Sequence, residues 1–334
     1  MRCPATNSRA KVALRGLELP LNHPEISTPI AAVVATFNPD LSVLRDQISR
    51  TACQVAWLIV VDDGSSNVKQ VAGLVNEFDG AECIALGDNA GVGHAHNVGI
   101  RRGLQNGARA VLILDQDTLP STNMVSVLAQ KLEELQRDDQ CIAAVGARYL
   151  GEQPGHQSFF VRFRRLRFEK CFCSNHRSGQ MIRADMLISS GTLFSATALN
   201  EIGDMEEGLF IDHVDTEWFL RAEHRNWRSY GVCDALMEHS LGERTFRVWL
   251  GRWRHLPVHK PFRYYYIYRN SVLLYRRVYP AARWKCADLV RLVLMAVVFL
   301  VFADQRITNL FMMCRGIVDG LRGQTGRKWQ VHPN

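Results

Sequence analysis

Residues 110–118 read AVLILDQDT, an apolar run that stops abruptly at two aspartates and a threonine. An unbroken run of this kind, with β-branched residues, is typical of a strand that is buried on both faces of a parallel sheet. Asp115, Asp117 and Thr118 would then lie at the carboxyl end of the strand, where open α/β sheets bind their ligands. Their oxygens suit Mg²⁺ or Mn²⁺, which can in turn hold a diphosphate. The alternative interpretation is a turn with two solvated acids.

Two earlier stretches have the same form. Residues 30–35 (IAAVVA) precede Thr36 and Asn38, and residues 57–61 (WLIVV) lead through one aspartate into Asp63. Because the carboxyl ends of parallel strands meet at one edge of a sheet, these polar side chains are expected to lie close together. The pattern predicts an α/β fold with a mostly parallel central sheet that is flanked by helices.

A glycine-rich segment, residues 87–99, lies between these strands. Its glycines allow the backbone to approach a ligand closely, and Asn97 could cap the segment or contact that ligand. The spacing is Gly-x-Gly-x-x-His, and the strand expected before it, residues 83–86, is short. Both features argue against a Rossmann dehydrogenase, and the sequence contains no Gly-x-x-x-x-Gly-Lys-Ser/Thr phosphate loop.

Residues 210–220, FIDHVDTEWFL, place three carboxylates in an otherwise apolar stretch. Ionised groups are costly to bury there unless they are paired, bound to a metal or used in chemistry. If a helix begins near Asp215, that carboxylate lies at its N-terminal end, where the helix dipole favours negative charge. A carboxylate on a rigid, partly desolvated edge meets the requirements of a general base. The alternative is an N-cap with surface acids.

Seven motifs occur in order along the chain, and together they identify a family resemblance. They lie at residues 34–39, 60–66, 89–99, 114–117, 187–191, 210–218 and 239–242. This series resembles the inverting GT-A glycosyltransferases of family 2, and within them the bacterial rhamnosyltransferases of O-antigen and related polysaccharides. The similarity runs from about residue 29 to 275, where residues 264–270 look like the family's Tyr-Tyr-x-x-Arg-Asn element.

The resemblance implies a role for each motif. Asp63 would contact the pyrimidine ring of the donor, Asp117 and His239 would bind Mg²⁺ or Mn²⁺, and Asp215 would be the catalytic base. The other residues implied to bind the nucleotide sugar are Thr36, Asn38, Asn89, Gly91, Asn97, Asp115, Ser190 and Gly191. The candidates on the acceptor side are Asp212, Glu217 and Trp218.

The donor and acceptor are expectations from the same resemblance. Many relatives have Glu-Asp where this chain has Val214-Asp215, and the wording Phe-Ile-Asp-x-Val-Asp-x-Glu-Trp is similar to that of rhamnosyl transfer. The implied donor is dTDP-β-L-rhamnose, and the implied acceptor is a glycan, carried on a polyprenyl diphosphate lipid. One alternative is a UDP-sugar donor, galactofuranose or GlcNAc. Another is a non-catalytic glycan-binding protein at a membrane surface, although it would need neither a base nor a metal site.

The charge distribution divides the chain. The net charge is +7, but residues 245–334 carry 16 Lys and Arg against 3 Asp and Glu. We predict an N-terminal extension (1–28), a GT-A domain (29–245) and a basic helical region (246–334). The apolar run 292–303 is shorter than the roughly 20 residues of a membrane span, so an interfacial or core helix is expected.

An anionic membrane surface is the partner that this basic region predicts, and a helical subdomain with a solvated basic face is the alternative. No recognition signature for nucleic acid accompanies the charge. No signal peptide is recognisable in residues 1–28, which predicts a protein at the cytoplasmic face of the inner membrane.

The remaining cysteine and aromatic patterns predict no further site. Nine scattered cysteines do not indicate a disulfide framework, and Cys171, Cys173 and His176 lack the second ligand pair of a zinc site. Residues 159–168 interleave aromatic residues with arginines. We favour an edge hairpin protected by charge over a mobile flap that meets an anionic acceptor.

Overall fold

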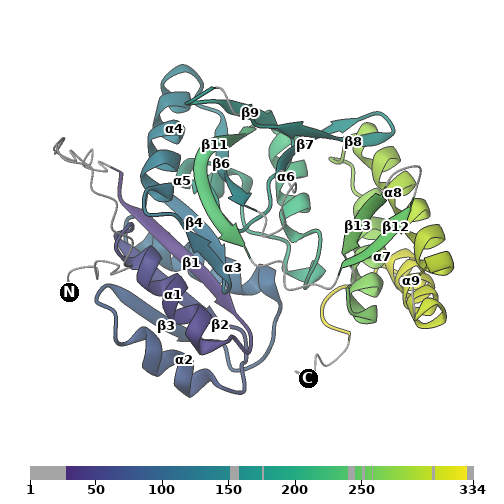
Figure 1. The fold of residues 1–334 in the computed structure, drawn as a ribbon, viewed down its shortest axis with the longest axis horizontal. Coiled ribbons are helices and arrows are strands. Elements are labelled where there is room, and N and C mark those ends of the chain that lie inside the picture. Colours follow the sequence, from purple (N-terminus) through teal and green to yellow (C-terminus); the bar gives the residue numbers. More distant parts are fainter. Residues whose placement is uncertain are drawn as a thin grey trace, which may run out of the picture.

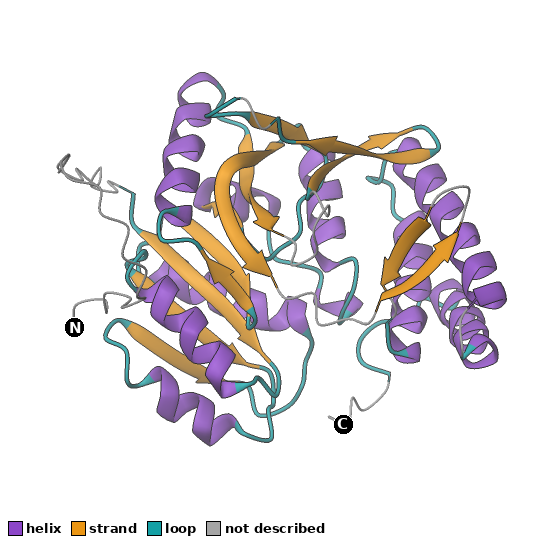
Figure 2. Cartoon of the chain, in the orientation of Figure 1, coloured by secondary structure: helices purple, strands orange, loops and turns teal. Residues whose placement is uncertain are grey.

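A mixed sheet with helices on both faces forms the centre of the molecule (Figures 1 and 2). The computed structural model describes residues 28–150, 158–174, 177–239, 245–249, 253–257, 259–302 and 305–328. The strand order is β3-β2-β1-β4-β10-β6-β11-β5, and β9 pairs with β11. The strands are β1 (Ile30–Thr36), β2 (Trp57–Asp62), β3 (Ala81–Ala85), β4 (Ala110–Asp115), β5 (Thr118–Pro120), β6 (Ile142–Leu150), β9 (Met181–Ala184), β10 (Thr192–Ser195) and β11 (Arg228–His239).

Both faces of the sheet are buried, as the apolar runs predict. Ile30, Ala32 and Val34 of β1 face α1 (Leu41–Ala52), α2 (Val68–Val75) and α4 (Met124–Asp138). Ala31 and Val33 point the other way, toward α3 (Val92–Gln105), α5 (Ala196–Ile202) and α6 (Val214–His224). This alternation follows from the two-residue period of a strand. The predicted α/β class and all three of the strands that end in polar residues are confirmed.

The strand register brings the polar ends together. Strands β1, β2 and β4 run parallel, with Thr36 beside Asp62 and Ala35 beside Asp115. Strand β10 is antiparallel to β4 and to β6, so the loop before β10 returns to the same edge. Side chains from distant parts of the sequence therefore meet at one edge of the sheet.

A helical region follows the sheet. It contains the β12 (Thr245–Trp249) and β13 (Trp253–Pro257) hairpin and then the helices α7 (Pro261–Tyr275), α8 (Ala282–Phe302) and α9 (Arg306–Leu321). Tyr264 and Tyr268 of α7 pack with Leu292 and Phe299 of α8 and Met313 of α9. The helical character of this region is confirmed, whereas the division at residue 245 stays a prediction, and residues 1–27 lie outside the described ranges.

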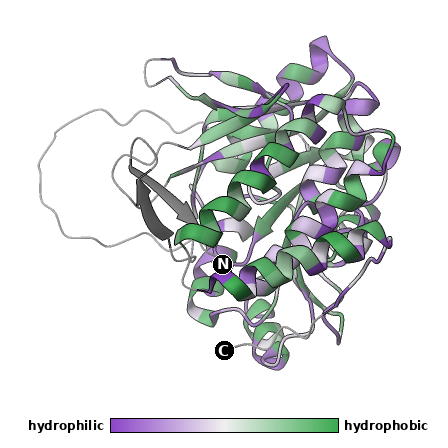
Figure 3. Ribbon diagram, turned by 90° about the vertical axis from the view of Figure 1, so that its right-hand side faces the viewer, coloured by the Kyte–Doolittle hydropathy of each residue, from purple (hydrophilic) through white to green (hydrophobic). Residues whose placement is uncertain are grey.

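Helices α8 and α9 expose an unusual amount of apolar surface. Of the nineteen exposed large hydrophobic side chains among the described residues, eight lie on α8 and six on α9. Figure 3 views the molecule from this side and shows hydrophobic segments (green) along the helices that face the viewer. Within the described ranges, no helix combines the length and apolarity needed to span a bilayer.

The aromatic and arginine-rich segment forms a hairpin. Strand β7 (Phe159–Arg164) pairs antiparallel with β8 (Arg167–Phe172), which confirms the hairpin interpretation. Phe163 is buried against Leu220, Leu274 and Trp284, so the hairpin connects the sheet to α6 and to the helical region (Figure 1).

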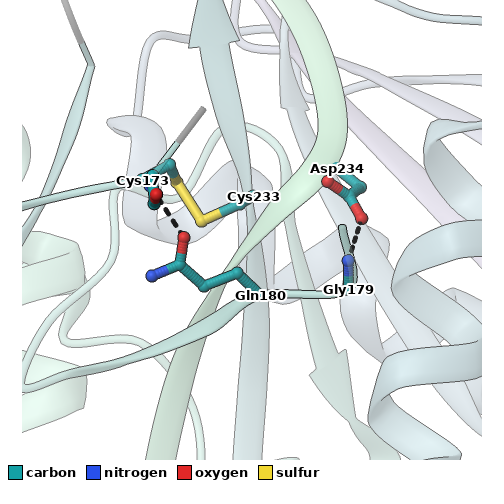
Figure 4. The surroundings of a disulfide bond; sticks show 6 residues. Cys173, Gly179, Gln180, Cys233 and Asp234 are labelled. Atoms are coloured by element: carbon teal, nitrogen blue, oxygen red, sulfur yellow. Dashed lines mark hydrogen bonds between the residues drawn. A yellow bond between two sulfur atoms is a disulfide. The ribbon is translucent and has the colours of Figure 1, made fainter. Parts of the chain in front are cut away.

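One disulfide was not predicted. Cys173, after β8, is bonded to Cys233 of β11 across a sequence separation of 60 residues (Figure 4). The adjoining chain is held by Gln180, whose Oε1 accepts from the backbone N–H of Ser174 at 2.7 Å, and by Asp234, whose Oδ2 accepts from Gly179 N–H at 2.5 Å. Spacing along the sequence cannot reveal such a pair, because the fold alone brings the two strands together. Cys171 keeps a free thiol, and His176 lies outside the described residues.

Candidate active site

A cavity of about 490 Å³ opens at the polar edge of the sheet. Its wall combines the end of β4, the loop before β10, the loop before α6 with the first turn of that helix, two residues of α3, and single residues of β6 and α7. The residues that line it are Val92, His96, Asp115, Tyr149, Ile188, Ser189, Ser190, Ile211, Asp212, His213, Val214, Asp215 and Arg263. Four predicted site residues, Asp115, Ser190, Asp212 and Asp215, are thus brought into one cavity.

Asp215 lies in the first turn of α6, as a general base near a helix N-terminus would. The Thr216 backbone N–H donates to its Oδ1 at 2.7 Å. Burial raises the pKa of the Asp215 carboxyl, and the charge of Asp212 raises it further, against the effect of the Thr216 hydrogen bonds. A raised pKa makes the carboxylate a stronger base, because proton transfer is most efficient when the pKa is close to the working pH.

Asp212 has a partner that the sequence did not indicate. Arg263 of α7 donates from Nη2 to Asp212 Oδ1 at 2.7 Å, and both side chains line the cavity. The ion pair partly neutralises Asp212 and leaves a cation at the cavity wall. Arg263 was missed because it belongs to the basic C-terminal region, where many arginines follow one another without a distinguishing spacing.

Ser190 organises the acidic turn after β4. Its Oγ accepts a hydrogen bond from the Asp115 N–H at 2.9 Å and lies 2.7 Å from Thr118 Oγ1. This network fixes the backbone from which the Asp115 carboxylate reaches the cavity. Glycine is favoured at position 191, next to it, because φ there is 77°, and a Cβ would also displace the end of the Met237 side chain.

The predicted nucleotide residues gather beside this cavity. Asp63 accepts hydrogen bonds from the N–H groups of Ala90 (2.7 Å) and Gly91 (2.9 Å), so it fixes the glycine-rich loop. Burial raises the pKa of the Asp63 carboxyl, against the effect of these two hydrogen bonds. Thr36 Oγ1 donates to Asp62 at 3.1 Å. Each carboxylate oxygen has a further lone pair, so Asp63 can hold the loop and still accept a hydrogen bond from a ligand.

Two more of these predicted residues shape the same region. Asn38 Oδ1 accepts from the N–H of Ser66 at 2.9 Å, which joins the ends of β1 and β2. The side-chain oxygen of Asn89 is buried without a hydrogen-bond partner among the described residues.

Three predicted residues are turned away from the cavity into buried contacts. Asn97 is fully buried and uses its amide to bind Met205 N–H, Met205 O and Glu207 Oε1, so it fixes the chain just before residues 210–220. Glu217 is ion-paired with Arg221 at 2.7 Å. Trp218 is buried in the core below the sheet. Since α6 begins at Val214, Glu217 is turned by roughly 200° from Asp215 at 100° per residue.

Comparison with known proteins identifies the family of this chain. Residues 32–203 match the family model described as glycosyl transferase family 2. The chain belongs to this family. It is also 27% identical over 303 residues to the dTDP-rhamnosyl transferase RfbF of Shigella flexneri, an alignment that covers 90% of this chain and 98% of the relative.

Two solved structures are similar to this chain to different degrees. GalNAc-T7 with UDP, GalNAc and Mn²⁺ superposes with a TM-score of 0.52 at 12% identity, over 64% of this chain and 44% of that one. TarS of S. aureus gives a TM-score of 0.49 at 14% identity, over 83% of this chain and 44% of that one. The superposition on GalNAc-T7 and the family match agree with the GT-A fold that the motifs imply.

The oxygen donors of this family 2 enzyme fit a divalent cation. Asp115 and Asp117 follow each other at i and i+2, at the end of β4, and both are partly exposed. His239 pairs with Thr118 across β5 and β11, so the chain passes beside this turn, although the His239 side chain is outside the described part. Among the described residues, no group of three or more His, Cys, Asp or Glu could hold a metal. Carboxylate oxygens such as those of Asp115 and Asp117 are the ligands that Mg²⁺ prefers, and this ion commonly takes further ligands from substrate phosphates.

His96 is a site residue of this glycosyltransferase that sequence reasoning missed. It lines the cavity from α3 and is 2% exposed, and neither ring nitrogen has a hydrogen-bond partner among the described residues. Burial lowers the pKa of His96 to about 4, so the ring is neutral at pH 7. A buried, unpaired imidazole at a cavity wall is available to a ligand. Its four-residue spacing from Val92, on one helix face, is the signal that could have indicated it.

Proposed function

We propose that this glycosyltransferase moves L-rhamnose from dTDP-β-L-rhamnose to a hydroxyl of a glycan acceptor. The observation that carries the proposal is that Asp215 and Asp115 line one cavity. The pKa of the Asp215 carboxyl is raised by burial, as suits a general base, and Asp115 belongs to the turn proposed to contact the donor. The choice of donor is supported by the dTDP-rhamnosyl transferase to which nearly the whole chain aligns. The acceptor is a growing cell-surface polysaccharide on a polyprenyl diphosphate lipid.

The reaction that fits this arrangement is a single displacement. Asp215 takes the proton of the acceptor hydroxyl while that oxygen forms a bond to the anomeric carbon of rhamnose. The bond between this carbon and the dTDP oxygen breaks, and the nucleotide leaves with the electron pair. Because attack and departure occur on opposite faces, the anomeric configuration is inverted and one base is sufficient.

The other residues at this edge of the sheet act on the donor. Asp63 and the loop that it fixes hold the pyrimidine, and the His96 ring donates a hydrogen bond to an oxygen of the bound sugar nucleotide. Asp115 and Asp117, with His239, would hold Mg²⁺ or Mn²⁺. When bound, that ion stabilises negative charge on the diphosphate.

Calorimetric titration with dTDP and UDP, each with and without Mn²⁺, tests this proposal. We expect dTDP to bind at least about tenfold more tightly than UDP, a difference of about 1.4 kcal/mol, and only with the metal present. EDTA and the Asp117→Ala variant are controls that should remove the metal-dependent part. A preference for UDP would overturn the rhamnosyl donor in favour of galactofuranose or GlcNAc, and absence of nucleotide binding would favour a non-catalytic glycan-binding protein.

We further infer that the protein binds an anionic membrane surface, on the cytoplasmic side, through the apolar face of α8 and α9. This face consists of Leu289, Val290, Val293, Leu294, Val297, Leu300, Val301, Phe302, Ile307, Leu310, Phe311, Ile317, Val318 and Leu321. On α8 these positions follow helical periodicity and lie opposite the buried Leu292 and Phe299.

Charge favours a membrane over a second copy of the chain. The described residues 259–302 and 305–328 contain thirteen Lys and Arg against two Asp, and both aspartates, Asp288 and Asp319, are buried. Arg315 and Arg322 border the apolar stripe on α9, where their charged ends can reach lipid headgroups. Two such cationic faces would repel each other, whereas anionic lipid would attract each of them.

Vesicle sedimentation tests the membrane proposal. The double variant Leu294→Glu/Phe311→Glu should bind vesicles rich in anionic lipid at least about tenfold more weakly than the wild type. The reason is that each apolar side chain contributes about 1.5–3 kcal/mol when buried. Val278→Glu is the matched control, since Val278 is 92% exposed but lies in the turn between α7 and α8. Equal binding of the double variant, or a wild-type dimer that binds no vesicles, would contradict the proposal.

A further inference from the structure

The loop before α6, residues 209–213, has a backbone that requires external support. Phe210, Asp212 and His213 all have positive φ, between 60° and 66°, although none is glycine. Such conformations are unfavourable for L-residues and persist only where surrounding contacts hold them. His213 is the N-cap of α6 and offers no side-chain cap to the helix, so the start of the helix, and with it Asp215, depends on the conformation of this loop.

The support comes from helix α7. Asn270 is fully buried, and its Nδ2 donates to three carbonyl oxygens of the loop, those of Leu209 (3.0 Å), Ile211 (2.8 Å) and Asp212 (2.9 Å). Its Oδ1 accepts from Arg269 Nε at 2.9 Å, which fixes the orientation of the amide. The left-handed conformation prevents these carbonyl groups from forming regular backbone hydrogen bonds, and the Asn270 side chain provides their partner instead.

Arg269 and Ser271, on either side of Asn270, complete the contact. Arg269 is 1% exposed, donates from Nη2 to Leu209 O at 2.8 Å, and lies 4.7 Å from the centre of the Tyr266 ring. Ser271 Oγ is 3.0 Å from His213 Nε2. Burial lowers the pKa of His213, which keeps the ring neutral and lets Nε2 accept this hydrogen bond.

The same loop also contacts the donor side. The Phe210 carbonyl accepts a hydrogen bond from Val92 N–H at 3.0 Å, directly after Gly91 of the glycine-rich segment. A shift of the loop would therefore move the base relative to the donor as well as to the acceptor.

We propose that Asn270 is a positioning residue for catalysis: it holds the 209–213 loop in its left-handed conformation and thereby places Asp215 against the bound donor. The proposal rests on the role of Asp215 in the proposed function. It assigns a task to the Tyr-Tyr-x-x-Arg-Asn element, which lies outside the nucleotide and metal sites. Asn270 itself does not line the cavity, so it acts through the loop.

The test separates positioning from stability by comparing Asn270→Ala with Tyr268→Phe. The control removes an equally buried hydrogen bond of α7, from Tyr268 Oη to Leu292 O at 2.6 Å, that does not touch the loop. Both variants should have a lower Tm. Only Asn270→Ala should lower kcat, by about 30- to 100-fold, while the donor KM and the dTDP Kd stay within about threefold, because misplacement by about 1 Å costs on the order of 10²-fold.

Two further readouts keep the result decisive. Hydrogen exchange of residues 208–216 should accelerate in Asn270→Ala and not in Tyr268→Phe, and this holds whatever the sugar donor is. If the wild type transfers no rhamnose but exchange still differs, the proposed function fails and the positioning role stands. Should Asn270→Ala not fold, Ser271→Ala, which removes the contact with His213 together with the Ser271 hydrogen bonds to Tyr275 and Asp288, should lower kcat several-fold. Turnover that falls in proportion to Tm in both variants, or unchanged loop exchange, would overturn the proposal.

Discussion

Asp215→Asn is expected to lower turnover on the order of 10³-fold while metal-dependent binding of dTDP is retained. The amide keeps the shape of the carboxylate and can still accept the Thr216 N–H, but it cannot take a proton from the acceptor hydroxyl. Single-turnover transfer measured beside calorimetric dTDP binding separates the two effects. Near-normal transfer by this variant would remove Asp215 from the role of base.

The same substitution should leave the fold as stable as the wild type or more stable at pH 7. Burial raises the pKa of Asp215 above its unfolded value, so folding favours the protonated form. Stability from this group is present below the unfolded pKa and is lost as pH rises through the folded pKa. Asparagine, being uncharged, avoids that loss. For the wild type, the acidic limb of kcat should have a midpoint above the ordinary Asp value of about 3.9.

Gly91→Ala is expected to be strongly disruptive although it adds only one methyl group. Gly91 has φ 100°, and a Cβ there would lie 2.6 Å from the Phe210 carbonyl oxygen and 2.9 Å from Phe210 Cα. Backbone strain and overpacking together should reduce the free energy of unfolding by about 2 to 5 kcal/mol. Turnover should fall more than about 10²-fold, because relief of the clash displaces the 209–213 loop.

Gly73→Ala provides the matched control. Gly73 lies inside α2, and no atom lies within 4 Å of the position that a Cβ would take. Alanine there should stabilise the protein by about 0.5 to 1 kcal/mol, because it has the better helix propensity. Urea unfolding and turnover are measured on both variants. If Gly91→Ala unfolds at the wild-type urea concentration and keeps a tenth or more of its turnover, the packing of this loop against Phe210 is not required.

The sequence indicates the fold and the edge of the sheet because local signals agree there. Apolar runs that end in Asp or Thr mark strands whose ends must meet, and Asp115, Ser190 and Asp215 do line one cavity. The antiparallel insertion of β10 and the return of β11 are not visible in the sequence, since they depend on pairings between distant segments.

The sequence does not reveal which side chains point toward the cavity. Asn97 sits in a motif that suggests ligand contact, yet its amide is turned toward residues 205–207. Trp218 follows the base by less than one helical turn and is nevertheless in the core. His96 and Arg263 enter the cavity from elements whose phase relative to the sheet becomes known only in three dimensions.

The contact between α7 and the 209–213 loop has a consequence for how such enzymes can exchange parts. The segment that matches the family model ends at residue 203, before the loop begins, whereas Asn270 and Arg269 lie about sixty residues beyond it. A hybrid joined between residues 203 and 209 inherits the loop and its holder from one parent. A hybrid joined near residue 245 takes the loop from one parent and α7 from the other. The loop that positions Asp215 would then no longer contact the helix with which it occurs in its own parent.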